Sequence, residues 1–274
     1  MSAFEAPSLM SIPQSPAAPA APTPRPDAIP RCALSLAGWA FIDGRSEDKL
    51  DLSLLPPRSR RGLSPLMRMS IAATAAALGD APERLGELLL ISASARGELN
   101  VALELLHQRE AGNPTSPLRF RNSVHNAVSG VLGIASGNHH PATSIAAGVD
   151  TLALAILETS AWVSDLGRDA LLLVAESALE PPFFAPENDR PGALALLVRA
   201  PGEDPTDTAL GAPALPELRC HRSKNIAATA VLAEGESDPM APVAALAAAL
   251  EASQGWAHET RSGWSLELVP AASV

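Results

Sequence analysis

Two histidine-bearing segments hold the side chains whose types suit acid–base or metal chemistry. The first, residues 122–126 (NSVHN), brings Ser123, His125 and Asn126 together along the chain. A serine near a histidine suggests a nucleophile with its base, but side chains two residues apart on a helix point away from each other. The sequence therefore favours a structural His125 that is hydrogen-bonded to backbone, with a Ser–His dyad as the alternative.

The second segment is the loop at residues 137–141 (GNHHP), in which His139 and His140 are adjacent. Zinc sites use such histidines together with cysteines or carboxylates, and none stands close by in the sequence to complete a ligand set. We expect a solvated or partner-facing loop here, with zinc binding as the alternative.

A glycine corner follows this loop, where the short apolar run 142–147 (ATSIAA) meets Gly148. In several enzyme folds a nucleophile occupies such a corner, at the positive end of a helix. Here the corner consists of Ala147, Gly148 and Val149, none of which can attack a substrate. Ser144, inside the run, is the nearest hydroxyl on the strand side.

The residues after the corner predict a buried helix between two strands. Residues 149–163 are almost continuously apolar, as in a helix buried on all sides. Asp150 and Thr151 are predicted to cap its start, and Gly167 to end it. A second apolar run, 170–175, then completes a strand–helix–strand unit, which predicts a parallel pair of strands.

The rest of the chain alternates between strand-like and helix-like patterns. Strands are predicted at residues 32–42, 88–94, 192–200, 215–221 and 264–269, and helices at 65–78, 99–108, 119–135 and 238–252. The 215–221 strand is expected to pair back with the 192–200 strand. Alternation across residues 32–200 predicts an α/β layered domain with a mixed sheet.

Composition narrows the class of protein. The 274 residues carry a net charge of −10, which disfavours nucleic-acid binding because phosphate contacts need clustered basic residues. No stretch approaches the roughly 20 apolar residues of a membrane span. Two cysteines far apart in the sequence and no recognisable signal peptide favour a reducing, cytoplasmic location. Residues 1–30 are rich in proline and alanine, which predicts a disordered tail.

The ordered segments resemble the N-terminal half of β-ketoacyl synthases of the thiolase-like fold. The resemblance rests on LLISASARGE, FRNSVHNAVSGVLGIASG, ATSIAAGVDTLALAILE and LLLVAESALEPPF, within about residues 32–200. The resemblance is strongest to short, chain-length-factor-like proteins. These proteins are encoded in gene clusters for aryl polyenes and related fatty-acid or polyketide products. It implies a thiolase-like half at residues 31–222, a layered mixed sheet with buried and flanking helices, followed by a short helix-and-strand extension at 223–274.

The resemblance also shows what this chain lacks. Active ketosynthases carry a catalytic cysteine at the corner between the strand and the buried helix, and the matching position here is Gly148. Neither Cys32 nor Cys220 can be aligned there. Only about 50 residues follow Cys220, without the histidine-bearing loops of the second ketosynthase half. We therefore expect a degenerate ketosynthase with no independent condensing activity.

Chain-length factors pair with an active β-ketoacyl synthase, so the resemblance implies a heterodimer in which this chain helps to line the acyl tunnel. It would need no cofactor, acting on phosphopantetheine-bound acyl chains through its partner. The acidic acyl carrier protein is expected to dock on the ketosynthase, because this chain is acidic too. The candidate interface or tunnel residues are Ser123, His125, Asn126, His139, His140, Ser144 and Asp150.

Two other functions remain open from the sequence. One is an acyl-thioester hydrolase or transferase that uses Ser123, His125 or Ser144. The other is a stand-alone acyl-binding module without chemistry. The small residues at 129–136 and 142–147 suit close packing against a partner, but they equally suit packing inside one domain.

Overall fold

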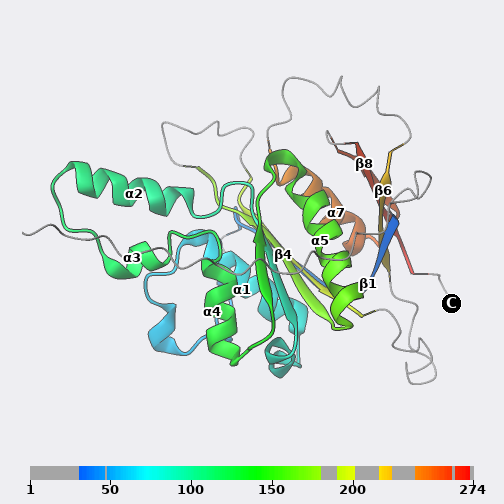
Figure 1. Cartoon of the computed structure of the whole chain (residues 1–274), viewed down its shortest axis with the longest axis horizontal. Coiled ribbons are helices and arrows are strands. Elements are labelled where there is room, and N and C mark those ends of the chain that lie inside the picture. The colour runs from blue at the N-terminus through cyan, green and yellow to red at the C-terminus, as the bar shows by residue number, and fades with distance from the viewer. Residues whose placement is uncertain are drawn as a thin grey trace, which may run out of the picture.

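The computed structural model describes residues 31–46, 48–179, 190–200, 216–223, 238–260 and 263–271. Within these residues, eight strands form one mixed sheet in the order β3-β2-β4-β5-β1-β6-β8-β7 (Figure 1). This is the α/β fold with a mixed sheet that the sequence predicts. The predicted N-terminal tail lies outside the described residues.

Three parallel strands form one end of the sheet. β2 (Leu89–Ala93) lies between β3 (Ala142–Ile145) and β4 (Ala170–Glu176) and pairs in parallel with both. The helix α5 (Thr151–Leu166) connects β3 to β4. The predicted strand–helix–strand unit is therefore present, but its two strands pair with β2 instead of with each other. All five residues of β2 are buried, which suits an interior strand.

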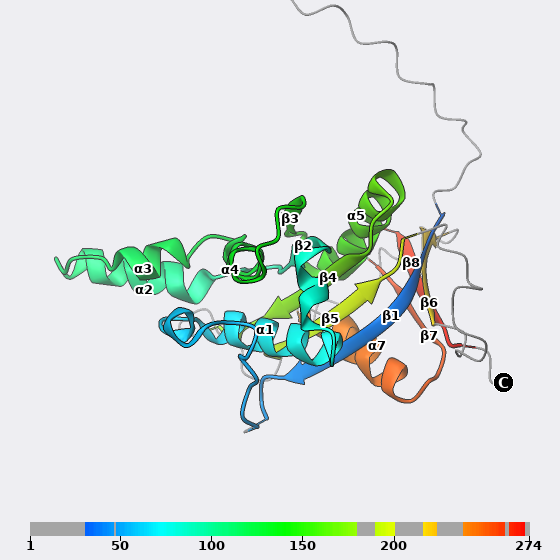
Figure 2. The same cartoon turned by 90° about the horizontal axis from the view of Figure 1, so that it is seen from below.

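The long strand β1 (Arg31–Asp43) joins the two ends of the sheet. Its second part, from Leu36 onwards, pairs antiparallel with β5 (Gly192–Val198), and its first part pairs antiparallel with β6 (Glu217–Arg222). The register shifts between Leu36 and Gly38, where the strand passes from one ladder to the other. Figure 2 shows β1 curving along the molecule between these neighbours.

The remaining strands form an antiparallel end. β6 pairs with β8 (Trp264–Val269), which pairs in turn with β7 (Trp256–Glu259). The expected pairing of residues 215–221 with the 192–200 strand is thus wrong, because β1 lies between β5 and β6 and saturates the inner edges of both. Strand β7 is an addition to the predicted elements.

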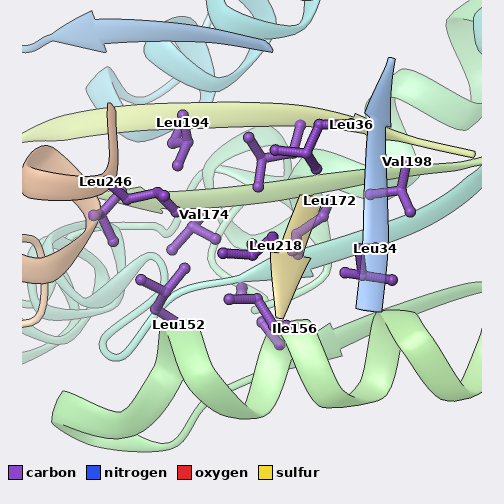
Figure 3. Packing of buried hydrophobic residues seen from close by; sticks show 14 of the residues in the cluster. Leu34, Leu36, Leu152, Ile156, Leu172, Val174, Leu194, Val198, Leu218 and Leu246 are labelled. Atoms are coloured by element: carbon purple, nitrogen blue, oxygen red, sulfur yellow. The ribbon is translucent and has the colours of Figure 1, made fainter. Parts of the chain in front are cut away.

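Helices cover both faces of the central strands. On one face, α5 and α7 (Ala241–Glu251) pack on the sheet; on the other face lie α1 (Pro65–Leu78) and α4 (Ala127–Ser136). Every residue of β4 and of β5 is buried. Leu172 and Val174 of β4 face the α5 side, as Figure 3 shows, whereas the alternate residues face α1.

The helix α7 and the strand β8 belong to the same hydrophobic core as the preceding strands. Leu246 of α7 and Leu266 of β8 are in one cluster with Leu218 of β6 and with β4. The described parts of residues 31–222 and 223–274 therefore share one sheet and one core.

The helix predicted at residues 119–135 is two helices in the structure, α3 (Pro117–Arg121) and α4. The intervening turn has local hydrogen-bond partners that compete with a continuous helix. The Asn122 side chain is buried and donates to the Gly62 carbonyl oxygen at 3.0 Å, while Ser123 Oγ donates to the Phe120 carbonyl oxygen at 2.8 Å.

Other helices begin or end at residues that the sequence predicts. Ser64 Oγ accepts a hydrogen bond from the Met67 amide at the start of α1, with Pro65 in the first turn. Gly137 ends α4 and Gly167 ends α5, both in the left-handed conformation that glycine adopts without penalty.

The helix α2 (Leu99–Glu110) and α3 project from the body of the molecule beyond α4 (Figures 1 and 2). We call this pair the α2–α3 arm. Three short 3-10 helices, η1 (Pro57–Arg60), η2 (Pro82–Gly86) and η3 (Gly148–Asp150), complete the described elements. Within the described residues, no helix has the length and apolar character needed to cross a bilayer.

We expect Ile156→Ala to lower the free energy of unfolding by about 3 kcal/mol, because Ile156 is fully buried between α5 and the sheet. Leu166→Ala, on the same helix but 42% exposed, is the control and should change it by less than about 0.5 kcal/mol. Urea denaturation measures both. Equal losses from the two variants would contradict the packing described for α5.

Candidate functional site

The corner between β3 and α5 is closed by a threonine. Thr151 Oγ1 donates to the Gly148 carbonyl oxygen at 2.6 Å and accepts from the Ala147 amide at 3.1 Å. The side chain of Asp150 makes no capping hydrogen bond with α5, so the predicted cap by Asp150 is wrong. Thr151 lies within reach of both backbone groups of the turn and stabilises it instead.

Gly148 at this corner is exposed and has a φ angle of +56°. A Cβ atom built on Gly148 would meet no other atom within 4 Å, so there is open space beside this position. The left-handed φ disfavours any residue with a side chain at this position. The corner therefore has room for a nucleophile but carries none.

The two cysteines lie far from this corner. Cys32 is hydrogen-bonded to Ser160 of α5 and to Cys220. Ser160 is nine residues along α5 from Thr151, so it lies about 14 Å along the helix axis from the start of α5. Neither thiol can act as the nucleophile there.

Ser123 and His125 do not form a hydrogen-bonded dyad in the structure. Ser123 Oγ donates to the Phe120 carbonyl oxygen, and His125 Nε2 lies 2.9 Å from the Ser94 carbonyl oxygen. Ser123 thus binds the backbone of its own turn and His125 that of the segment after β2, and no hydrogen bond joins the two side chains. A serine without a bonded base has no means of activation.

A buried carboxylate lies near His125. Glu176, at the end of β4, is 2% exposed and accepts hydrogen bonds from the Ala95 amide and from Ser94 Oγ, the latter at 3.0 Å. Its Oε2 atom is buried without a hydrogen-bond partner. Burial is the main cause that raises the pKa of Glu176 to about 7. Glu176 is thus a buried carboxylate that is held chiefly by hydrogen bonds.

A second acid, Glu98, lies in the same region and was not singled out from the sequence. It is 6% exposed, accepts a hydrogen bond from Ser64 Oγ at 2.6 Å, and burial raises its pKa. Glu98, Ser94 and His125 line a cavity of only about 10 Å³, which is too small for any substrate. The two acids therefore anchor the turn after β2 through their hydrogen bonds.

Asn138 fixes the histidine loop. Its Nδ2 atom donates to the carbonyl oxygens of Leu85 and Leu88 at 2.7 and 2.8 Å, and its Oδ1 accepts from the His140 amide at 2.7 Å. His139 is exposed and His140 is half-buried, directly before β3. In the part of the chain that the structure describes, no three metal-ligating side chains come together. The loop presents His139 to its surroundings.

The strand β3 is the last strand of the sheet, so one edge of it is unpaired by any described residue. Ser94 N–H donates to the Ile145 carbonyl oxygen and Leu90 N–H to that of Pro141. Because this pattern repeats every two residues, the N–H and C=O groups of Ser144 point to the free edge. The Ser144 hydroxyl itself is 2.6 Å from Ser92 Oγ. No charge, proline or bulge protects this edge.

Large apolar side chains are exposed on the neighbouring helices. Five of the six large hydrophobic residues exposed among those described lie on α4, on the α2–α3 arm or between them: Leu106, Leu118, Phe120, Val124 and Ile134. Phe120 is 66% exposed and Ile134 is 86% exposed. Isolated exposed leucines need no explanation, but such a cluster is typical of a binding surface.

A groove of about 440 Å³ runs between η1 and α4, and we call it the α4 groove. Val124, Val131 and Ile134 contribute its apolar wall, and Asn126 lies in its lining. Gly130, also in the lining, leaves the helix surface open because no other atom lies within 4 Å of the position of its missing Cβ. Of the residues singled out from the sequence, Asn126 is thus the one that lines this groove.

Arginines surround the α4 groove although the chain as a whole is acidic. Arg58 and Arg121 line it, and Arg60 donates to the carbonyl oxygen of Leu55 in the same lining. Arg68 contacts the Arg60 backbone. None of these four side chains forms a salt bridge with a described carboxylate. The groove therefore combines an apolar wall with a basic rim.

Residues 38–265 match the family model for the N-terminal domain of β-ketoacyl synthases. This chain therefore belongs to the β-ketoacyl synthase family, in agreement with the resemblance seen in its sequence. No curated protein matches the chain in sequence.

Solved structures share the fold at low sequence identity. A chain in the complex of the ketosynthase ApeO with its chain length factor ApeC, from Xenorhabdus doucetiae, is 19% identical with a TM-score of 0.63, covering 86% of this chain and 98% of that one. A chain of the ishigamide ketosynthase/chain length factor is 15% identical with a TM-score of 0.60, covering 88% and 100%. A β-ketoacyl synthase from Burkholderia phymatum is 11% identical with a TM-score of 0.51, covering 68% and 63%. These likenesses establish the thiolase-like fold.

The buried carboxylate makes the stability of this protein depend on pH. An unfolded glutamate titrates near pH 4.3, whereas burial raises the pKa of Glu176 to about 7. Between these values the unfolded state loses the proton first, so the free energy of unfolding falls as pH rises and levels off above pH 7. Glu176→Gln cannot titrate, and we expect it to remove about 3–4 kcal/mol of this fall, which is the difference of about 2.7 pKa units at about 1.4 kcal/mol per unit.

Urea denaturation from pH 4.5 to 8 measures the effect. Glu110→Gln, at an exposed position of α2, is the control and should retain the full pH dependence. The free energy of unfolding of Glu176→Gln should still fall with rising pH, but with a shallower slope, because burial also raises the pKa of Glu98. Identical slopes for Glu176→Gln and the unaltered protein would contradict the buried, titrating state of Glu176.

Proposed function

We propose that this chain is a non-catalytic, chain-length-factor-like subunit that pairs with an active β-ketoacyl synthase and helps to shape its acyl tunnel. The observation that carries the proposal is the corner at Gly148. A member of this family with open space but no nucleophile at that corner cannot form the acyl-enzyme thioester itself. We infer that this chain instead assists a subunit that can form the thioester.

The free edge of β3 supports pairing with another chain. An uncharged edge with outward N–H and C=O groups is a ready template for adding a strand. Ser144 lies on this edge, with His139 and His140 in the preceding loop. Asp150 lies at the corner behind it. We propose that these four residues border the ketosynthase partner.

The exposed apolar cluster and the α4 groove support a role in shaping a tunnel. An apolar wall suits an acyl chain, and a partner placed over α4 would close the open side of the groove. Asn126 lies in the lining, while Ser123 and His125 fix the turn that leads into α4. The fold is shared with chains from complexes of ketosynthases with chain length factors, which is consistent with this role.

We propose that the acyl carrier protein delivers its chain mainly to the ketosynthase partner. The net charge of −10 repels an acidic carrier at long range. The arginines at the α4 groove act only within about 8–10 Å at physiological salt, so they affect the last stage of an encounter. No cofactor of its own is part of the proposal, because phosphopantetheine arrives attached to the carrier.

The other functions receive less support. A hydrolase or transferase needs an activated nucleophile, whereas Ser123, His125 and Ser144 are each hydrogen-bonded to groups that give no activation. A stand-alone acyl-binding module would bury its ligand, but the α4 groove is open on one side.

Co-expression with the ketosynthase encoded beside it, followed by mass determination, should yield a one-to-one heterodimer. Ser144→Pro removes an outward-facing N–H group without touching the ladder to β2, so we expect at least tenfold weaker pairing. Ser144→Val also loses the hydrogen bond to Ser92 but keeps the N–H group, and it should pair like the unaltered chain. A purified chain that does not bind the ketosynthase would refute the proposal. Tight binding of Ser144→Pro to the ketosynthase would refute only the role of the β3 edge.

We expect Ile134→Glu to weaken the heterodimer about tenfold, because a charge would replace an apolar side chain in the proposed contact. Ile134 is 86% exposed, so thermal stability of the isolated chain should stay unchanged. Leu166→Glu, an exposed leucine on α5, is the matched control and should not affect pairing. Titration calorimetry measures both, and equal affinities for the two variants would place the ketosynthase elsewhere.

A further inference from the structure

The two cysteines of this chain lie opposite each other on neighbouring strands. Cys32 of β1 and Cys220 of β6 are register partners in the antiparallel ladder, and both are free thiols. Their side chains are in hydrogen-bond contact with each other, and Cys32 also bonds Ser160 of α5. The fold thus creates a thiol pair from positions that the sequence keeps far apart.

The spacing of the pair suits a disulfide bond. Leu36 N–H donates to the Pro216 carbonyl oxygen at 3.0 Å, which identifies a hydrogen-bonded pair of this ladder. Such pairs recur at every second residue, so Cys32 and Cys220 are also a hydrogen-bonded pair, with Cα atoms about 5.5 Å apart. Disulfides span Cα distances of about 4.4–6.8 Å. Register partners also point to the same face of the sheet.

The two thiols differ in accessibility and acidity. Cys220 is 1% exposed, whereas Cys32 is half-buried and packs at the border of the core. The hydrogen bond from Cys220 is the main cause that lowers the pKa of Cys32. The same bond, followed by burial, raises the pKa of Cys220. This asymmetry is typical of an attacking and a resolving thiol.

We propose that Cys32 and Cys220 form a reversible dithiol–disulfide pair that exchanges with small disulfides of the glutathione type. The Cys32 thiolate attacks one sulfur of the small disulfide, forming a mixed disulfide and releasing one thiolate. The Cys220 sulfur then attacks the Cys32 sulfur, forming the intrachain bond and releasing the second thiolate. The two protons of the protein thiols pass to the released groups. The protein is oxidised by two electrons, and the small disulfide is reduced to two thiols.

This site is separate from the proposed partner surface. β1 and β6 lie on the far side of β4 and β5 from the free edge of β3. Formation of this disulfide therefore does not depend on pairing with a ketosynthase. A bond between Cys32 and Cys220 would join β1 covalently to the antiparallel end of the sheet.

The experiment incubates the full, reduced chain with excess glutathione disulfide and follows intact mass. We expect the mass to fall by that of two hydrogens, free thiols to drop from two to none, and a peptide digest to link Cys32 to Cys220. Dithiothreitol should reverse all three changes. A product that keeps glutathione attached, remains reduced, or forms disulfide-linked dimers would overturn the proposal.

Two variants test the assigned roles. Cys220→Ala should stop at a mixed disulfide on Cys32, because the resolving thiol is missing. Cys32→Ser should react at least tenfold more slowly than Cys220→Ala, because only the buried thiol remains. In denaturant the two variants should react at similar rates, which separates thiol environment from folding. Equal reaction rates of the two folded variants would overturn the assignment of Cys32 as the attacking thiol and Cys220 as the resolving thiol. The mass measurement on the unaltered chain tests disulfide formation even if a variant fails to fold.

Discussion

Burial of the central strands on both faces is the constraint on which the other features depend. Because all residues of β4 and β5 are buried, the sheet needs helices on both sides, and α5 with α7 on one face and α1 with α4 on the other supply them. This arrangement fixes the position of α5, and with it the corner at Gly148. It also leaves β3 at the edge of the sheet, where no described residue pairs with its outer side.

Around this scaffold, the polar groups that appear catalytic by residue type serve structure. Glu176 and Glu98 hold the turn after β2, His125 binds the Ser94 backbone, and Thr151 closes the corner. Each of these groups makes at least one hydrogen bond within the fold, although Oε2 of Glu176 has no partner. At the corner itself, Gly148 carries no side chain, and no other atom lies within 4 Å of the position that a Cβ would take.

The surface carries apolar side chains and backbone groups that the described residues leave uncovered. Figure 2 shows β3 and α4 at the side of the molecule that faces the α2–α3 arm. The exposed residue Ile134 and much of the lining of the α4 groove belong to α4. Apolar area and backbone groups left open in this way are stabilised when another chain covers them. These open groups on one side of the molecule underlie the proposed role as a partner subunit.

The sequence by itself determined most of the elements, since apolar periodicity, Ser64, Gly137 and Gly167 are local signals. It also determined that no nucleophile stands at Gly148. It failed at residues 119–135, where the Asn122 side chain bonds the distant Gly62 and breaks the helix.

Only the tertiary structure decided which strands pair, because pairing depends on burial across the whole sheet. It placed β2 between β3 and β4, and β1 between β5 and β6. The burial of Glu176 and the meeting of Cys32 with Cys220 follow from those pairings, and packing of the helices brings Arg58 of η1 and Arg121 of α3 to one groove. Such contacts join residues far apart in the chain, and no local pattern of residue types specifies them.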